Sequence, residues 1–173
     1  VYAKHGHEQK IYIRRSSKPG DATTWDEEQV FIPSPSSRVT YSNLFRLTGE
    51  NGRIYNFFRG IHNSFKPSWM YSDDDGRTWT AGGIAINVPS QFRHRPYVKY
   101  ASNGRDQIHL AYTEGHPRDF NNSIYHVIYQ DGQLRRSDGS VIASLKDGMP
   151  RPEDGTRVFE GGPDRVAWIS DMH

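Results

Sequence analysis

The feature that most constrains this chain is an internal repeat. Three pairs of similar segments recur at a spacing of roughly 55 residues, the length of one supersecondary unit. The aligned pairs are 40–47 with 95–101, 52–60 with 104–115, and 11–25 with 68–79. Tyr41 and Tyr97 are 56 residues apart, and so are Ser16 and Ser72. A repeat of this kind predicts one structural unit that is stacked several times.

Each repeat is expected to hold four short strands. In the second repeat, short alternating runs predict strands at 41–47, 53–59, 67–72 and about 79–86, with Asn-Gly and Asp-Gly steps at the turns. The composition agrees, because tyrosine, phenylalanine and tryptophan favour strands, whereas leucine occurs only five times. We therefore expect an all-β chain with helix confined to a turn or two.

Four-stranded units of about 55 residues have the size of a β-propeller blade. We divide the 173-residue chain into a partial blade at 1–39, whole blades at 40–91 and 92–155, and the start of a next blade at 156–173, with its first strand near 165–170. Since propellers typically have about four to eight blades, about three blades correspond to an incomplete propeller or half-propeller. Exposed strand edges then predict either a homo-oligomer or the remaining blades of a larger protein.

One motif fits a known turn pattern, S-x-D-x-G-x-T-W, at every fixed position. The matching residues are Ser72, Asp74, Gly76, Thr78 and Trp79. This Asp-box suits a hairpin between the outer strands of a blade, because the aspartate caps its own turn and the glycine supplies positive φ. The tryptophan is expected to pack between blades. A degraded copy from Ser16 to Trp25 is two residues longer and lacks the Asp-x-Gly core. We interpret the Asp-box as structural.

Together these motifs resemble the bacterial neuraminidase-repeat (BNR) propellers over nearly the whole chain. The Asp-box alone is shared with sialidases, sortilins and photosynthetic assembly factors. One branch of this family contains seven-bladed ulvan lyases, which cleave sulfated algal polysaccharides at uronate residues. The chain resembles this branch in several short segments, namely 41–43, 58–60, 95–97, and 115–117 followed by 122–125. The resemblance implies a secreted or periplasmic, carbohydrate-active propeller whose partner is an acidic polysaccharide, although no signal peptide is visible.

The repeat alignment also brings three charged loops to one level of the propeller funnel. Each follows an apolar strand, and the loops are 4–7, 59–62 and 114–118. Loops of this kind often carry function because a rigid scaffold positions them. The structural alternative is that they are polar loop tips in which each side chain only makes local hydrogen bonds.

A β-eliminating lyase needs a base, an acid and a cation that stabilises an enolate-like charge, and the resembled lyases combine His, Tyr and Arg. The candidates are His116 as base, His126 as second-choice base, Arg59 or Arg118 as the neutralising cation, and His5 and Glu114 as substrate-binding residues. The tyrosine that would act as the general acid is not identified from the sequence, since it could lie on a blade outside this chain.

The excess of arginine over lysine favours an anionic ligand. The chain has 16 Arg but only 6 Lys, and a guanidinium pairs with carboxylate or sulfate through two bonds at once. In the dense cluster at 92–97, His94 and Arg95 are candidates for binding such groups at the funnel rim. A buried position between blades is the structural alternative for Arg95. The net charge of +2 is too small to indicate nucleic acid, and no apolar stretch is long enough to indicate a membrane partner.

The chain is expected to need no cofactor. The absence of cysteine excludes disulfides and thiolate metal sites, while a structural calcium or zinc ion stays open because of the eight histidines. Two other function classes also stay open. One is a non-catalytic glycan-binding or assembly propeller. The other is a sialidase-like glycoside hydrolase, which requires three convergent arginines, a Tyr–Glu pair and an acidic aspartate.

Overall fold

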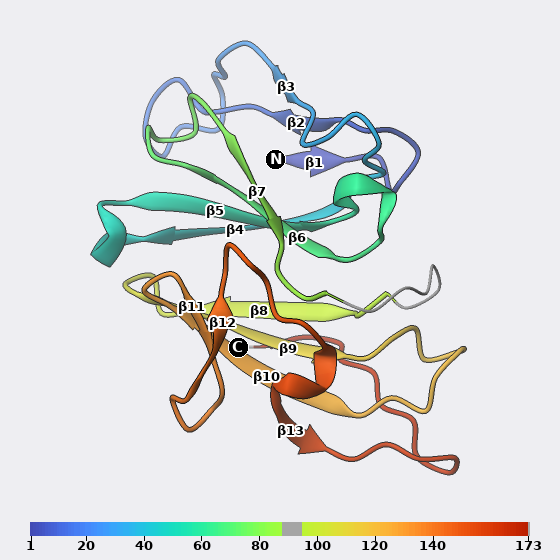
Figure 1. The fold of residues 1–173 in the computed structure, drawn as a ribbon. Coiled ribbons are helices and arrows are strands. Elements are labelled where there is room, and N and C mark those ends of the chain that lie inside the picture. Colours follow the sequence, from blue (N-terminus) through green and yellow to red (C-terminus); the bar gives the residue numbers. More distant parts are fainter. Residues whose placement is uncertain (88–94, 173) are drawn as a thin grey trace.

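The computed structural model describes residues 1–87 and 95–172, and strands dominate this part of the chain (Figure 1). The strands form three antiparallel sheets. Helical geometry in the described residues is limited to three short 3-10 turns, Thr48–Glu50, Ile61–Asn63 and Pro152–Asp154. No described helix has the length and apolar character needed to span a membrane. The prediction of an all-β chain with blade-like sheets is therefore confirmed.

The first two sheets follow the chain in up-and-down order. The first has the order β1-β2-β3, with strands at Tyr2–Ala3, Ile11–Ile13 and Gln29–Phe31. The second has the order β4-β5-β6-β7, with strands at Thr40–Leu47, Arg53–Arg59, Pro67–Ser72 and Thr80–Ile84. Strands that follow one another in the chain pair with one another. The shortest connection in the second sheet is the β4–β5 turn, in which Asn51 and Gly52 both have positive φ.

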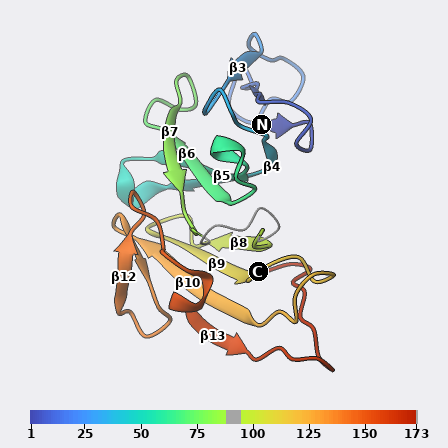
Figure 2. The same cartoon turned by 45° about the vertical axis from the view of Figure 1, so that its right-hand side comes forward.

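The third sheet is the largest. Its continuous part consists of β8 (Val98–Ser102), β9 (Gln107–Thr113) and β10 (Ile124–Gln130). One edge of β10 is shared by β11 (Gln133–Arg135) and β13 (Thr156–Phe159), and β12 (Val141–Ser144) pairs with β11. Figures 1 and 2 show β8 as the strand of this sheet nearest to the second sheet.

The segment after β13 differs from the expectation. The structure has no strand at 165–170, because a strand needs a neighbour to complete its hydrogen-bond ladder and no described strand pairs with this segment. The segment is instead held along the third sheet, where the Ala167 N–H donates to the Asn122 carbonyl (3.2 Å). This path brings Trp168 beside Tyr97, with 5.8 Å between the ring centroids.

Two apolar cores join the sheets. The core between the first and second sheets includes Ile11, Phe58 and Met70. The core between the second and third sheets includes Phe57 and Leu110, both fully buried. Burying side chains of this size contributes about 1.5–3 kcal/mol each, so the sheets stabilise one another across their faces.

A polar clamp crosses the core between the second and third sheets. The hydroxyls of Tyr55 on β5 and Tyr129 on β10 both donate to the Glu50 carboxylate, at 2.6 and 2.7 Å. Burial is the main cause that raises the pKa of Tyr55 to about 12, and it also raises the pKa of Tyr129. The clamp therefore holds two sheets in a fixed relation through neutral phenols.

The Asp-box forms the turn between β6 and β7. The Asp74 carboxylate accepts hydrogen bonds from the Thr78 N–H (2.8 Å), the Thr78 hydroxyl (2.7 Å) and the Ser72 hydroxyl (2.8 Å). The bonds from Thr78 are the main reason why the pKa of Asp74 falls to about 2. Gly76 has a φ of 80°, and Trp79 packs, half-buried, against the core between the first and second sheets. The motif thus closes an outer hairpin.

The degraded copy of the Asp-box forms an equivalent turn. The Asp21 carboxylate accepts hydrogen bonds from the Thr23 N–H (2.8 Å) and the Thr24 hydroxyl (3.1 Å). The Trp25 indole donates to the carbonyl three residues earlier, as the Trp79 indole does in the Asp-box. The sequence identified this segment as a degraded copy but did not identify Asp21 as its capping residue, because the segment is two residues longer and lacks the Asp-x-Gly core.

Candidate functional site

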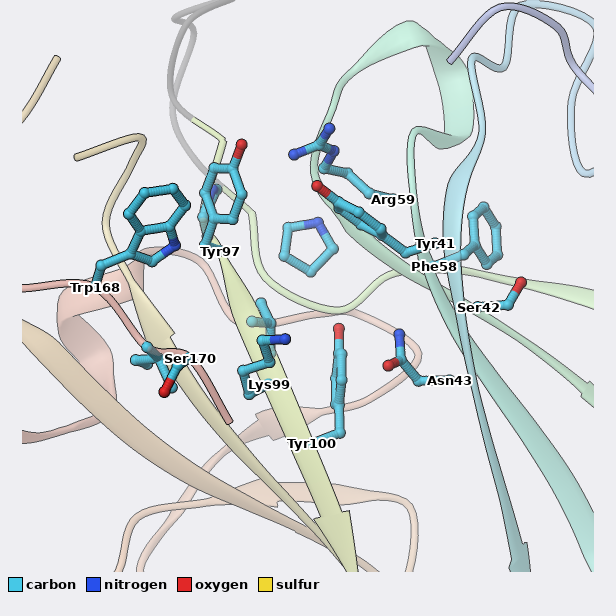
Figure 3. Close-up of a pocket in the computed structure, with 14 residues that line it drawn as sticks. Tyr41, Ser42, Asn43, Phe58, Arg59, Tyr97, Lys99, Tyr100, Trp168 and Ser170 are labelled. Atoms are coloured by element: carbon cyan, nitrogen blue, oxygen red, sulfur yellow. The ribbon is translucent and has the colours of Figure 1, made fainter. Parts of the chain in front are cut away.

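A cavity of about 630 Å³ lies between the second and third sheets (Figure 3). It lies along β4 and β8, which are edge strands of their sheets. Aromatic side chains form much of its wall, with Tyr41 from β4, Tyr97 just before β8 and Trp168 from the C-terminal segment. Pockets of about 300–1,000 Å³ are the usual size for binding small organic ligands, so this cavity has room for sugar residues.

Arg59, the last residue of β5, places a buried cation at the wall of the cavity. Only 6% of its surface is exposed. The guanidinium carbon lies 4.8 Å from the ring centroid of Tyr41 and 5.5 Å from that of Tyr97, within cation–π range. Its Nε and Nη1 atoms have no hydrogen-bond partner in the described part of the chain. Since buried polar groups are normally paired, Arg59 is suited to bind an anion that enters the cavity.

A β-bulge directs Tyr41 toward this cation. The pairing of β4 with β5 shifts its register between Thr40 and Asn43, and Tyr41 has a φ of 66°, in the left-handed region that such residues rarely adopt. Asn43 secures the bulge, since its N–H donates to the Asn56 side chain (3.0 Å) and its amide to the Phe57 carbonyl (3.0 Å). Strained backbone of this kind is concentrated at functional sites.

Tyr97, His116 and Trp168 pack ring against ring beside the cavity. The His116 centroid lies 5.2 Å from that of Tyr97 and 6.0 Å from that of Trp168. His116 is buried, and its Nδ1 accepts a hydrogen bond from the Arg118 N–H (3.1 Å). Burial, followed by the charges of Arg118 and Arg95, lowers the pKa of His116. This shift favours the neutral imidazole, and His116 packs against Tyr97 without lining the cavity.

Several candidates from the sequence meet near these rings. The His5 ring is edge-on to Tyr41, with centroids 5.8 Å apart. Arg118 adjoins His116 through both its backbone and its side chain. Arg95 is half-buried, and its Nε has no partner among the described residues. The charged loops expected at one level are thus linked through contacts with two tyrosines.

Glu114 and His126 do not line the cavity. The Glu114 carboxylate accepts hydrogen bonds from the Tyr125 hydroxyl (3.0 Å) and from a backbone N–H (2.7 Å), and so fastens the β9–β10 connection. The His126 ring contacts that of His109, with 3.1 Å between ring nitrogens. This pair lies on the sheet face turned away from the core, because alternate residues of β9 and β10 are buried. His94 lies outside the described residues.

Sequence reasoning missed the aromatic wall of the cavity. Tyr41 and Tyr97 occupy the same place in two repeats. Trp168 follows Arg165 with two residues between them, as Tyr41 follows Arg38. The repeat alignment therefore held a signal for all three aromatics, although it was used only to predict strands and the charged loops. Among the described residues, no three His, Asp or Glu side chains gather in a way that could hold a metal ion.

The fold and the cavity together define the class of this protein. Short antiparallel sheets that pack face against face, with Asp-box turns between their outer strands, are blades of the β-propeller type. The chain belongs to the BNR repeat-containing family, whose family model matches residues 1–163. Comparisons with curated proteins and with solved structures gave no significant match. The family resemblance expected from the sequence is confirmed at this level.

Proposed function

We propose that this protein binds acidic polysaccharide in the cavity and cleaves it by β-elimination at a uronate residue. The carrying observation is the buried guanidinium of Arg59, whose Nε and Nη1 have no partner among the described residues. No acidic side chain is among the described residues that line the cavity, so Arg59 and Lys99 leave its wall positively charged. The similarity of 41–43 and 58–60 to ulvan lyases agrees with this proposal. Since such polymers lie outside cells, a secreted or periplasmic location goes with it.

The reaction needs one cation and two proton transfers. The Arg59 guanidinium would bind the uronate carboxylate and stabilise the negative charge that develops as C5 loses its proton. A base removes that proton, a double bond forms between C4 and C5, and the bond from C4 to the glycosidic oxygen breaks. An acid then protonates the departing oxygen. The products are a shortened polymer and a chain that ends in an unsaturated uronate.

Two tyrosines lie close to Arg59, and each would carry out one of the two proton transfers. Burial raises the pKa of Tyr41, although Arg59 opposes this shift. Tyr41 therefore keeps its proton at neutral pH and would protonate the departing oxygen. Tyr97 would accept the C5 proton. His116 packs edge-on against Tyr97, and in this assignment it is a positioning residue rather than the base.

Product formation tests the proposal. The protein is incubated with uronate polymers while the near-ultraviolet absorbance of unsaturated product is followed. Tyr41→Phe removes one hydroxyl and is expected to lower kcat at least about 100-fold, the effect of losing a general acid, while polymer binding is retained. Arg59→Gln is expected to weaken both binding and turnover, because the cation contacts the carboxylate in ground and transition states. Tyr12→Phe, in the first sheet, is the matched control and changes neither.

A non-catalytic glycan-binding propeller is the second candidate. Trp168 exposes 61% of its surface beside Tyr97 and so offers a flat face on which a sugar ring can stack. A pure binding protein would retain acidic oligosaccharides, lose affinity on Trp168→Ala and yield no unsaturated product from any uronate polymer. That combination of results would refute the elimination.

The cavity is less suited to sialidase-like hydrolysis. Glycoside hydrolysis ordinarily uses acidic side chains at the reacting bond, and none is among the described lining residues, which include one arginine. A fluorogenic sialoside separates the two reactions. Its hydrolysis by the protein would contradict the proposed lyase.

A further inference from the structure

We propose that Lys99 recognises a second anionic group of the substrate, on a sugar residue next to the one bound at Arg59. This inference rests on the proposed function and assigns Lys99 a role in substrate specificity. Lys99 lines the cavity from β8. Together with Arg59 it is one of two cationic side chains in the described wall, and the two cations come from different sheets.

The two cations are placed to bind separate anions. Lys99 follows Tyr97 by two residues, so both side chains project from the same side of β8. At about 3.3 Å per residue, their Cα atoms lie about 6.6 Å apart. Figure 3 shows Arg59 near Tyr41 and Tyr97, whereas Lys99 lies further along β8, beside Tyr100. Because the two cations come from different sheets and lie at different points of the cavity wall, they can contact charged groups on different sugar residues.

The side chain of Lys99 is exposed and forms no ion pair or hydrogen bond with another described residue, and the same is true of Lys10, Lys18 and Lys146. By contrast, Lys4 pairs with Glu8 (3.2 Å) and Lys66 donates to the Asn87 side chain (2.8 Å). What distinguishes Lys99 from the other three unpaired lysines is its place in the cavity wall. The wall thus holds an unpaired ammonium and a guanidinium with two unpaired nitrogens, and none of its described residues is acidic. This combination favours a ligand that carries more than one negative charge.

The chemistry of the two side chains indicates what each would bind. A guanidinium matches a carboxylate through two parallel bonds and fixes its orientation, as the reacting uronate requires. An ammonium is a point charge with three rotatable donors, so it accepts a sulfate ester or a second carboxylate. The substrate class is therefore a polymer with anionic groups on successive residues, either sulfated next to the uronate or uronate throughout.

Titration calorimetry with three size-matched oligosaccharides tests this inference. One carries a single uronate, the second adds a sulfate on the neighbouring residue, and the third adds a carboxylate there. The Tyr41→Phe background prevents turnover. The second anion is expected to improve affinity about five- to tenfold, the effect of one charge-assisted contact at an exposed site. A larger gain from sulfate or from carboxylate identifies the group that Lys99 binds.

Variants at Lys99 separate this role from a general electrostatic effect. Lys99→Gln is expected to remove the gain from the second anion while leaving affinity for the single uronate unchanged, and Lys99→Arg is expected to keep the gain. Lys18→Gln, at an exposed lysine outside the cavity, is the matched control and keeps it as well. If Lys99→Gln weakens all three ligands equally, or none of them, the inference is wrong. Failure of the proposed function has a different signature, because Arg59→Gln would then leave single-uronate affinity unchanged.

Discussion

Replacing Arg59 by methionine is expected to stabilise the fold while it abolishes function. Each buried donor without a partner costs about 1–3 kcal/mol, so the unpaired Nε and Nη1 atoms together cost about 2–6 kcal/mol. The cation–π contacts with Tyr41, Tyr97 and Phe65 offset about 1.5–6 kcal/mol of this, at about 0.5–2 kcal/mol each. Methionine fills similar space without a donor, and its sulfur regains about 0.3–1.5 kcal/mol from contact with an aromatic ring. We expect Arg59→Met to raise the free energy of unfolding by about 1–2 kcal/mol.

Thermal unfolding measures this gain. The cores are rich in aromatic side chains, so near-ultraviolet circular dichroism reports the loss of tertiary packing. At about 2–4 °C per kcal/mol for a chain of this size, Tm is expected to rise by about 2–8 °C. Polymer binding and product formation, assayed on the same samples, are expected to be lost. Arg53→Met is the control, since Arg53 donates to the Asp73 carboxylate at 2.6 and 3.0 Å and its removal gives no gain.

A clear fall in Tm for Arg59→Met would refute the reasoning. It would mean that the guanidinium holds the second and third sheets together and is satisfied by the fold itself. The proposed function would then lose the observation that carries it. A rise in Tm with activity retained would instead place the anion-binding group elsewhere in the protein.

Three other measurements test the fold. The free energy of unfolding is expected to be constant just below pH 10 and to fall between pH 10 and 12. The reason is that tyrosines of the unfolded chain ionise near pH 10, whereas the folded state holds the pKa of Tyr55 at about 12 and raises that of Tyr129. Tyr129→Phe should flatten this pH dependence, as measured by urea titrations. Trp79→Ala should lower the free energy of unfolding by about 2 kcal/mol, below the 3–5 kcal/mol of a fully buried aromatic, without changing ligand affinity. The outer edges of β4 and β8, which pair with no described strand, predict self-association, most simply a dimer. A monodisperse monomer near 19.9 kDa in light scattering at high concentration would contradict it.

Local patterns were sufficient to predict most strands of the second sheet. The expected strands at 53–59 and 67–72 coincide with β5 and β6, because alternation and turn residues act over only a few positions. The expected strand at 165–170 does not form, because strand formation depends on a partner that local sequence does not specify. In the degraded Asp-box at 16–25, the capping role of Asp21 was not identified, since its hydrogen bonds tolerate a spacing that a fixed motif does not.

The candidate site shows the same division. Arg59 was found from the repeat alignment because homologous loops occupy equivalent places in stacked units. Tyr41 was not, because its orientation depends on a bulge that Asn43 and Asn56 stabilise across two strands. The sequence did not indicate that His116 packs behind the cavity wall, because this depends on its contacts with Tyr97 and Trp168, which do line the cavity.

The sequence by itself determined the repeat, the all-β class and the family, because these depend on periodicity and on turn residues that act locally. It also showed an excess of arginine over lysine. It did not determine which arginine or lysine side chain lacks an acidic partner, since the chain has 20 acidic residues and any of them could have paired with Arg59. Only the tertiary structure decided this, because the way two sheets pack brings Arg59 and Lys99 to one cavity wall where no described acidic side chain reaches.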